Sequence, residues 1–147
     1  MSDARQAPAI TVETSDVLAP EVLAIRRAVF IDEQGIPEAA ELDGTDGGCT
    51  HWLLRSEGTP VATLRTATSD DVLRIGRVAT LAPARGRGHA RRLMDAAMAH
   101  GRSSGLTTAR LSAQQGVVAW YERLGFVAEG PFYDDGGIPH RDMRAAL

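Results

Sequence analysis

Residues 74–92, RIGRVATLAPARGRGHARR, are the segment that most constrains the fold. They contain six arginines and no acidic residue, although the whole chain has a formal net charge of -3. The segment passes from a strand-like stretch through Arg85-Gly86-Arg87-Gly88 into an amphipathic helical pattern. Cations crowd the start of that helix, where the macrodipole is already positive and acidic residues are normally favoured. Free N–H groups at a helix start, approached closely through glycines, bind phosphate. The segment therefore predicts an anion site between a strand and a helix.

The totals favour one globular domain over residues 1–147. A content of 44% hydrophobic and 24% charged residues is typical of soluble proteins. No apolar run reaches membrane-spanning length, and the first ten residues, MSDARQAPAI, lack the pattern of a signal peptide. We therefore expect a cytoplasmic protein with no membrane partner. The single cysteine, Cys49, excludes an internal disulfide and is too few for a thiolate zinc site, so we expect no metal.

Hydrophobic periodicity and turn residues predict an alternation of strands and helices. Residues 32–49 are expected to be loop-rich, with at most one short helix, and Gly76 is expected to mark a bulge or a close backbone approach. The predicted strands are 9–13, 51–55, 61–67, 72–81, 109–111, 126–129 and 141–145, and the predicted helices are 20–31, 88–102 and 117–124. This order indicates a mixed α/β layer, one sheet with helices on its faces.

Four blocks resemble the GCN5-related N-acetyltransferase (GNAT) family. The family's acetyl-CoA motif, (R/Q)-x-x-G-x-(G/A), is matched by Arg85, Gly88 and Ala90. Residues 119–126, AWYERLGF, are similar to the family's helix that ends in YexlGF. Residues 27–34, RAVFIDEQ, and 133–140, YDDGGIPH, resemble the small bacterial ElaA-like subfamily. The resemblance implies the GNAT fold, a mostly antiparallel twisted sheet with helices on both faces, and acetyl-CoA as the donor.

The resemblance also implies which residues hold the donor. Strand backbone would pair with the pantetheine arm, and amides of the loop would hold the pyrophosphate, with arginine side chains reaching further phosphate oxygens. The strand residues are Val78, Ala79 and Thr80, and the loop residues are Arg85, Gly86, Arg87, Gly88, His89, Ala90 and Arg91 or Arg92. Two arginines that precede the loop, Arg74 and Arg77, serve either the sheet or the acceptor side. The alternative for the whole cluster is a solvated basic helix face.

One amide residue extends this set. Gln114 lies seven residues before Tyr121, where many members of the family place an asparagine that contacts the cofactor. The chain contains no asparagine, and glutamine offers the same amide on a longer arm. A loop residue without such a contact is an equal alternative.

The chemistry of acetyl transfer requires a polarised carbonyl, a neutral amine and a proton for the departing thiolate. The resemblance implies that Tyr121 is the general acid; the alternative is a core tyrosine beside Trp120. For the general base the residues leave Glu33, His51 and His140 open. A glycine- and proline-containing turn can aim His140 into a cleft, whereas a strand-initial histidine such as His51 more often has a structural role. The expected acceptor-binding residues are Phe30, Glu33, Gln34, His51 and His140.

The segment 32–46 contains six acidic residues and no base. An acidic lip would concentrate cationic amines. Ordinary solubilising surface is the equal alternative.

Three classes of function follow from these features. The leading one is an acetyl-CoA-dependent N-acetyltransferase acting on a small amine, an aminosugar or a peptide or protein amine, as a monomer or homodimer. The second is a non-catalytic module that senses acyl-CoA. The third, a nucleic-acid binder, is disfavoured because the net charge is negative and only 5% of the residues are aromatic.

Overall fold

The computed structural model describes residues 7–147; the first six residues, on which the expectation about a signal peptide partly rests, lie outside that range. One seven-stranded sheet runs in the order β1-β2-β3-β4-β5-β7-β6. Its strands are β1 (Ile10–Ser15), β2 (Thr50–Ser56), β3 (Thr59–Ser69), β4 (Val72–Thr80), β5 (Thr108–Gln114), β6 (Val127–Asp135) and β7 (Ile138–Ala146). The helices are α1 (Pro20–Arg26), α2 (Glu38–Glu41), α3 (His89–Ser103) and α4 (Val118–Arg123). No helix among these residues is long and apolar enough to cross a bilayer.

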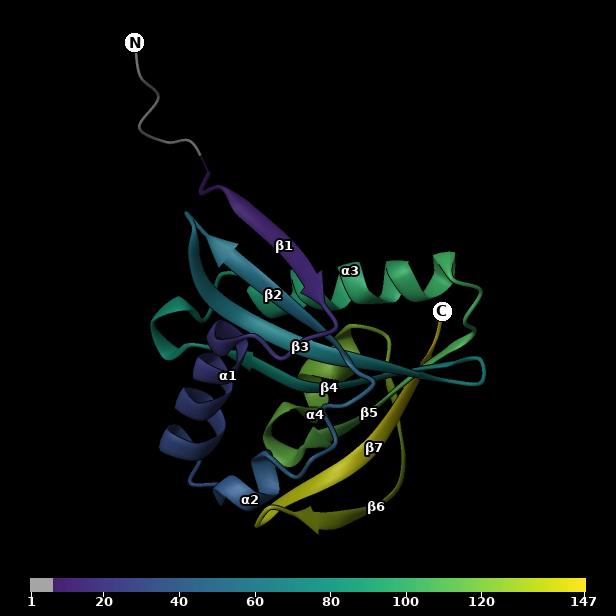
Figure 1. Ribbon diagram of the computed structural model, residues 1–147. Coiled ribbons are helices and arrows are strands. Elements are labelled where there is room, and N and C mark those ends of the chain that lie inside the picture. The colour runs from purple at the N-terminus through teal and green to yellow at the C-terminus, as the bar shows by residue number, and fades with distance from the viewer. Residues whose placement is uncertain (1–6) are drawn as a thin grey trace.

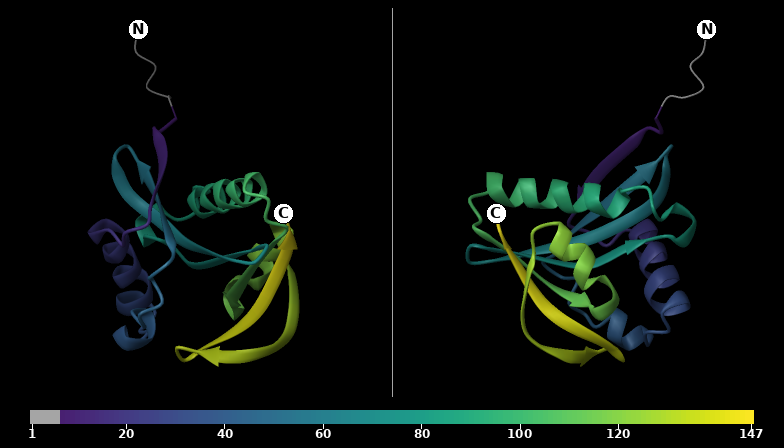
Figure 2. Two further views of the ribbon diagram at one scale, coloured as in Figure 1. Left: turned by 45° about the vertical axis from the view of Figure 1, so that its right-hand side comes forward. Right: turned by 180° about the vertical axis from the view of Figure 1, so that it is seen from behind.

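Neighbouring strands are antiparallel except for β4 and β5, which are parallel. A parallel pair needs a crossover connection, and α3 supplies it. Figure 1 shows α1 and α3 on opposite sides of the strands, and Figure 2 shows the same arrangement from two further directions. The prediction of a mixed, mostly antiparallel sheet with helices on both faces is confirmed.

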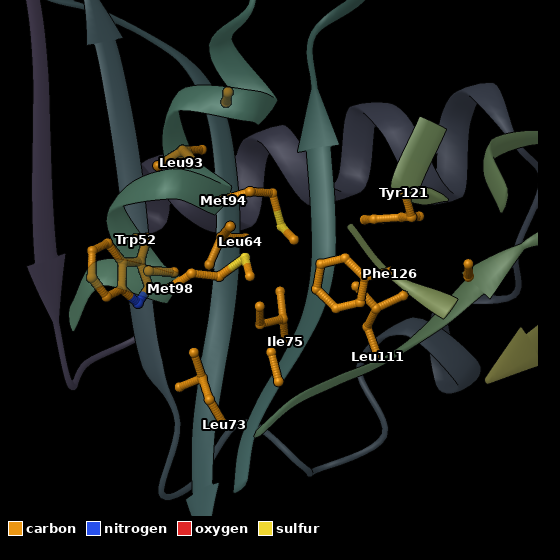
Figure 3. Packing of buried hydrophobic residues seen from close by; sticks show 14 of the residues in the cluster. Trp52, Leu64, Leu73, Ile75, Leu93, Met94, Met98, Leu111, Tyr121 and Phe126 are labelled. Carbon is orange, nitrogen blue, oxygen red and sulfur yellow. The ribbon is translucent and has the colours of Figure 1, made fainter. Parts of the chain in front are cut away.

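The larger core lies between the sheet and α3. The apolar stripe predicted for that helix buries Leu93, Met94 and Met98 against side chains of β2, β3 and β4. Figure 3 shows these side chains meeting Trp52 and Leu64 and continuing toward Tyr121 and Phe126. Because α4 packs into the same core, Tyr121 is held by the body of the protein and not by a surface loop.

A smaller core lies on the opposite face of the sheet. Val22, Ile25 and Val29 pack with Leu53 of β2 and Ala79 of β4. Phe30 belongs to the same cluster. Burial of apolar surface on both faces fixes β4 between two layers, so the end of that strand is a rigid platform.

The region after α1 differs from the expectation of a helix that ends at residue 31. The chain continues from Arg27 to Glu33 as a π-helix, in which the N–H of Gln34 bonds to the carbonyl of Val29. A π-helix is wider than an α-helix and is frequent at functional sites. It carries residues 30–34 to the end of β4, a position that apolar periodicity at 3.6 residues cannot indicate.

The C-terminal strands are longer than predicted. Pairing of β5 with β7 extends from Thr108 to Gln114, and β6 and β7 are joined by a tight turn at Gly136 and Gly137, both with positive φ. The predicted strand 109–111 covers only the part of β5 where the apolar residues Ala109 and Leu111 lie on one face. Its continuation alternates with polar residues that face a cleft, so the hydrophobic signal fades there.

A buried ionic network joins α1 and α2 to the sheet. Arg26 is only 1% exposed, and its Nε and Nη1 lie 2.5 Å from Glu41 and 2.7 Å from Asp46. Asp46 also accepts from Arg65 at 2.8 Å, and Glu41 lies 2.9 Å from Nε of Arg77. Asp43 lies 3.7 Å from Arg77, so three arginines and three carboxylates balance in charge within this network.

This network predicts loss of stability in acid. Burial alone would raise the pKa of Asp46, but hydrogen bonds from Arg26 and Arg65 outweigh it and lower the pKa from 3.8 to about 2. A depressed carboxyl pKa stabilises the fold above the unfolded value and loses that contribution as the pH falls through the folded value. We expect the free energy of unfolding to fall by roughly 2 kcal/mol between about pH 5 and pH 2 from this group. Urea titrations of the wild type and Asp46→Asn at several pH values measure it. An equally steep acid loss in the variant would contradict the assignment.

Candidate functional site

The cleft begins where β4 and β5 separate. Their pairing runs from Val72 opposite Thr108 to Ile75 opposite Leu111 and ends there. Beyond that point β4 continues to Thr80 with only β3 beside it, so its other edge faces a cleft of about 880 Å³. Val78, Ala79 and Thr80 line this cleft. A free strand edge offers backbone donors and acceptors to an extended ligand.

A bulge in β4 lies next to the point where it separates from β5. The register of β3 against β4 shifts between Thr63 and Arg65, and Arg77 has φ of 50°, in the left-handed region. The expectation that Gly76 marks an irregularity is right about the place and wrong about the residue, since the strained conformation falls on the arginine after it. Glu41 and the carbonyl of Glu41 both bind the Arg77 guanidinium, at 2.9 and 3.0 Å. These bonds stabilise a conformation that an arginine rarely adopts.

The loop before α3 has the form of a phosphate cradle. Gly86 and Gly88 have φ of 79° and 78°, and no atom lies within 4 Å of where a β carbon would stand on either. Gly88 is the N-cap of α3, with no side-chain cap for the first N–H groups of the helix. These amides therefore remain available to an anion. Gly86, Gly88, His89, Ala90 and Arg91 line the cleft, whereas Arg87 does not.

His89 adds no positive charge to this cradle. Its ring is buried, and burial, followed by the nearby Arg87 and Arg92, lowers its pKa below the usual value. The ring is therefore neutral at neutral pH. Its contribution to anion binding is limited to its backbone N–H at the start of α3.

Arg85 and Glu33 form a bidentate ion pair across the mouth of the cleft. Both guanidinium–carboxylate distances are 2.6 Å, and Nε of Arg85 donates to the carbonyl of Thr80 at 3.0 Å. The hydrogen bonds from Arg85 lower the pKa of Glu33. A carboxylate whose pKa is lowered is a poor proton acceptor, so the geometry disfavours Glu33 as general base.

The acidic segment 32–46 is largely neutralised, which disfavours an acidic lip. Five of its six carboxylates pair with arginines within 4 Å, and only Asp32 has no such pair among residues 7–147. The paired residues are Glu33, Glu38, Glu41, Asp43 and Asp46. The charge of the segment in the sequence cannot show this, because some of the arginines that pair with it, such as Arg85, lie far away along the chain.

The opposite wall of the cleft is the polar face of β5 and β7. His140 stands opposite Gln114, and its Nδ1 lies 2.7 Å from the carbonyl of Ile138. Since a carbonyl only accepts, Nδ1 donates to it, and in the tautomer that this bond selects the lone pair lies on Nε2. His140 stacks on Tyr133 with ring centroids 6.3 Å apart. It is thus oriented as a proton acceptor.

Three residues of this wall were not predicted from the sequence. The Tyr133 hydroxyl donates to Asp142 at 2.6 Å and contacts the Ser112 hydroxyl, and both Ser112 and Asp142 line the cleft. Alternation along β5 and β7 places Ser112 and Asp142 on the face that carries His140. A longer prediction for the strand at 109–111 would have found Ser112.

Gln34 and Gln114 connect the two walls. The side-chain amide of Gln114 donates to that of Gln34 at 2.8 Å, although the residues are 80 positions apart. Both line the cleft, as does Phe30. The hydrogen bond places the predicted cofactor residue Gln114 beside the predicted acceptor residue Gln34.

Tyr121 lies on the α4 side of the gap between β4 and β5. It lines the cleft, yet only 6% of the residue is exposed, and it makes edge contacts with Trp120 and Phe126. Burial raises the pKa of its hydroxyl well above the usual value, and no hydrogen bond or charge contributes to the shift. The side chain remains a protonated phenol throughout the physiological pH range, and a proton donor at the gap can act from this position.

His51 does not belong to the cleft. It is 2% exposed within β2, it does not line the cleft, and neither ring nitrogen has a hydrogen-bond partner among residues 7–147. Burial lowers its pKa. The prediction of His51 as acceptor-binding residue or base is therefore not supported by its location. A position near the start of a strand does not indicate on which face of the sheet the side chain of His51 lies.

Comparison with known proteins places the chain among acyltransferases. The Acetyltransferase (GNAT) domain family matches residues 11–147. A UPF0039 protein of Mycobacterium tuberculosis is 41% identical over 130 residues, covering 84% of this chain and 81% of that protein. An acyl-CoA N-acyltransferase from Pseudomonas aeruginosa is 33% identical with a TM-score of 0.79, covering 95% of this chain and all of that one (100%). Escherichia coli ElaA is 28% identical with a TM-score of 0.79, covering 93% and 99%.

Proposed function

The chain belongs to the GNAT acetyltransferase family, and from this premise we propose that it transfers the acetyl group of acetyl-CoA to a primary amine by direct attack in a ternary complex. The proposed acceptor is a small amine, an aminosugar or a peptide or protein amine. The observation that carries the proposal is the buried, protonated Tyr121 on the wall of a cleft that also contains a free strand edge and an uncapped helix start.

The residues fit the donor in two places. The uncapped N–H groups after Gly88 suit the pyrophosphate, and the free edge of β4 from Val78 to Thr80 suits the amide-containing pantetheine arm. Acetyl-CoA would supply an acyl group activated as a thioester. The Arg85 guanidinium, which Glu33 engages, is not required for this arrangement because the backbone amides provide the donors.

We assign the two proton transfers of the reaction to different residues, one to His140 and one to Tyr121. His140 accepts a proton from the ammonium form of the acceptor at Nε2, which leaves a neutral amine to form the new C–N bond. As the C–S bond breaks, Tyr121 donates its proton to the departing sulfur. The nitrogen of the new amide loses its second proton, which returns to the phenolate through solvent, and His140 releases the proton it accepted to solvent. The net result is one amide and one free thiol. Tyr121 belongs to the core between the sheet and α3, whereas His140 lies on the opposite face of the sheet. The proposal requires both to reach one reacting centre through the gap between β4 and β5.

Thiol release tests the proposal. Purified protein is mixed with acetyl-CoA and panels of amines, aminosugars and peptides, and free CoA thiol is followed with a thiol reagent. Acceptor-dependent release, with formation of the acetylated amine by mass spectrometry, supports it. Saturable binding of acetyl-CoA without release for any acceptor would overturn it in favour of the non-catalytic acyl-CoA sensor.

His140→Gln is expected to lower kcat/KM for the acceptor by ~100-fold near neutral pH, because a positioned general base is removed. The loss should shrink as the pH approaches the pKa of the acceptor, where the amine is already neutral. Stopped-flow or steady-state thiol release across pH measures this. His100→Gln, an exposed histidine at the far end of α3, serves as the control. A pH-independent defect would contradict the role of a base.

A further inference from the structure

A row of arginines crosses three adjacent strands and reaches the cleft with two of its members. Arg74 of β4 stands opposite Arg110 of β5, and Arg110 stands opposite Arg144 of β7. Neighbouring strands lie about 4.8 Å apart, so the three side chains emerge from adjacent positions on one face. Like charges directly opposite each other on a sheet are destabilising unless an anion lies between them.

Among residues 7–147, one carboxylate forms ion pairs with these three cations. Glu129 of β6 lies 2.7 Å from Arg110 and 3.1 Å from Arg144. Arg74, which is exposed, forms no ion pair among residues 7–147. Arg74 and Arg110 both line the cleft, whereas Arg144 does not. The unbalanced charge therefore faces the cleft.

The position of Arg74 assigns it to the acceptor and not to the donor. The free edge proposed for pantetheine begins at Val78, and the phosphate cradle follows it in the chain, both on one side of the bulge at Arg77. Arg74 lies on the other side, roughly 13 Å from Val78 along the strand. It shares its sheet face with Ser112 and Asp142, through the register of β4, β5 and β7.

We propose that the acceptor is a small amine that also carries a carboxylate, as a free amino acid does, and that Arg74 binds this carboxylate. The proposal rests on the proposed function and names its acceptor class. The wall formed by His140, Asp142 and Ser112 receives the ammonium end, and Arg74, beside Arg110, receives the carboxylate end as a charge-assisted bidentate donor. The pairing of five of the six carboxylates of the acidic segment with arginines agrees with this, because it leaves little uncompensated negative charge there to attract polycations.

Matched acceptors test the proposal. Each of a panel of free amino acids is compared with its primary amide and with the amine that lacks the carboxyl group, by thiol release from acetyl-CoA. We expect the free amino acid to have the highest kcat/KM in at least one set. Arg74→Gln should lower that value by ~10- to 100-fold, mainly through KM, and leave the amide and the decarboxylated amine unchanged. Arg74→Lys should recover part of the loss, because it keeps the charge without the planar fork.

Two controls separate this proposal from the proposed function. Arg102→Gln removes an exposed arginine at the end of α3, outside the cleft, and should behave as the wild type. The Kd of acetyl-CoA for Arg74→Gln should also equal that of the wild type. If amides or decarboxylated amines are the better acceptors, or if Arg74→Gln lowers kcat/KM equally for all three, the proposal is wrong while the acetyltransferase function stands.

A failure of catalysis would be recognised separately. If no acceptor releases thiol, the proposed function fails, and calorimetric titration of the CoA-loaded protein with the same three compounds decides the inference. Tighter binding of the free amino acid that is lost in Arg74→Gln would support a carboxylate site. Equal or absent binding of all three would overturn it.

Discussion

Replacing Tyr121 with phenylalanine is expected to lower kcat by ~10²- to 10³-fold while leaving the Kd of acetyl-CoA nearly unchanged. The substitution removes only the hydroxyl, so the buried ring keeps its contacts with Trp120 and Phe126. Without a proton donor, the sulfur must leave as a thiolate. Steady-state thiol release gives kcat, and equilibrium titration gives Kd.

The other tyrosine of the chain provides a matched control. Tyr133→Phe also removes one hydroxyl, but that hydroxyl binds Asp142 and Ser112 on the acceptor wall. Tyr133→Phe should therefore change the KM for the acceptor more than it changes kcat. Because burial raises the pKa of Tyr121 above its ordinary value near 10, the wild type should show no loss of kcat from ionisation of Tyr121 below about pH 10. Unchanged kcat in Tyr121→Phe would remove the assignment of a general acid.

Arg26→Ala should destabilise the fold by ~3–5 kcal/mol, because it leaves buried carboxylates without their cation. Arg26 is 1% exposed and contacts Glu41, itself 2% exposed, and Asp46. Glu41 also pairs with Arg77 at the bulge of β4. Arg26→Ala should therefore disturb the lining of the cleft as well as lower the stability of the fold. Urea unfolding followed by circular dichroism measures the stability, and the Kd of acetyl-CoA reports on the cleft.

The neighbouring arginine is the control for this prediction. Arg27 pairs with Glu38 at 2.6 Å, but the two side chains are 44% and 60% exposed. Exposed ion pairs contribute at most ~1 kcal/mol, so Arg27→Ala should shift the urea midpoint only slightly. Arg26→Lys should be intermediate, because one ammonium group cannot reproduce the forked contacts. Similar losses for Arg26→Ala and Arg27→Ala would show that the buried network is not a special source of stability.

Local patterns explain which elements were predictable. The 3.6-residue stripe of α3, the glycines before it and the alternating strands of the first half all act within a few residues of each other, and the structure confirms them. The π-helix at Arg27–Glu33 was missed because its hydrogen bonds skip one residue more than the helical pattern assumes. The extension of β5 to Gln114 was missed because polar residues alternate on the face that lines the cleft.

The residues of the candidate site also fall into those that local sequence patterns could predict and those that they could not. The cradle of Gly86 and Gly88 depends on a short run of backbone, so the motif was sufficient to locate it. The contacts of Glu33 and of the wall formed by β5 and β7 could not be predicted from the sequence in this way. Glu33 is engaged by Arg85, 52 positions away, and the wall residues Ser112 and Tyr133 meet only through the pairing of β5, β7 and β6.

By itself, the sequence determined the order of the elements, the strand–loop–helix anion site and the family resemblance, because helix periodicity, strand alternation and glycine conformation are local properties of the chain. Only the tertiary structure decided which of the adjacent Arg26 and Arg27 is buried, that the acidic segment is largely neutralised, and that Arg74 lines the cleft without an ion pair to residues 7–147. Burial and charge pairing depend on residues brought together from distant positions. The sequence predicts where an anion would bind, whereas the fold determines which arginines pair with carboxylates among residues 7–147.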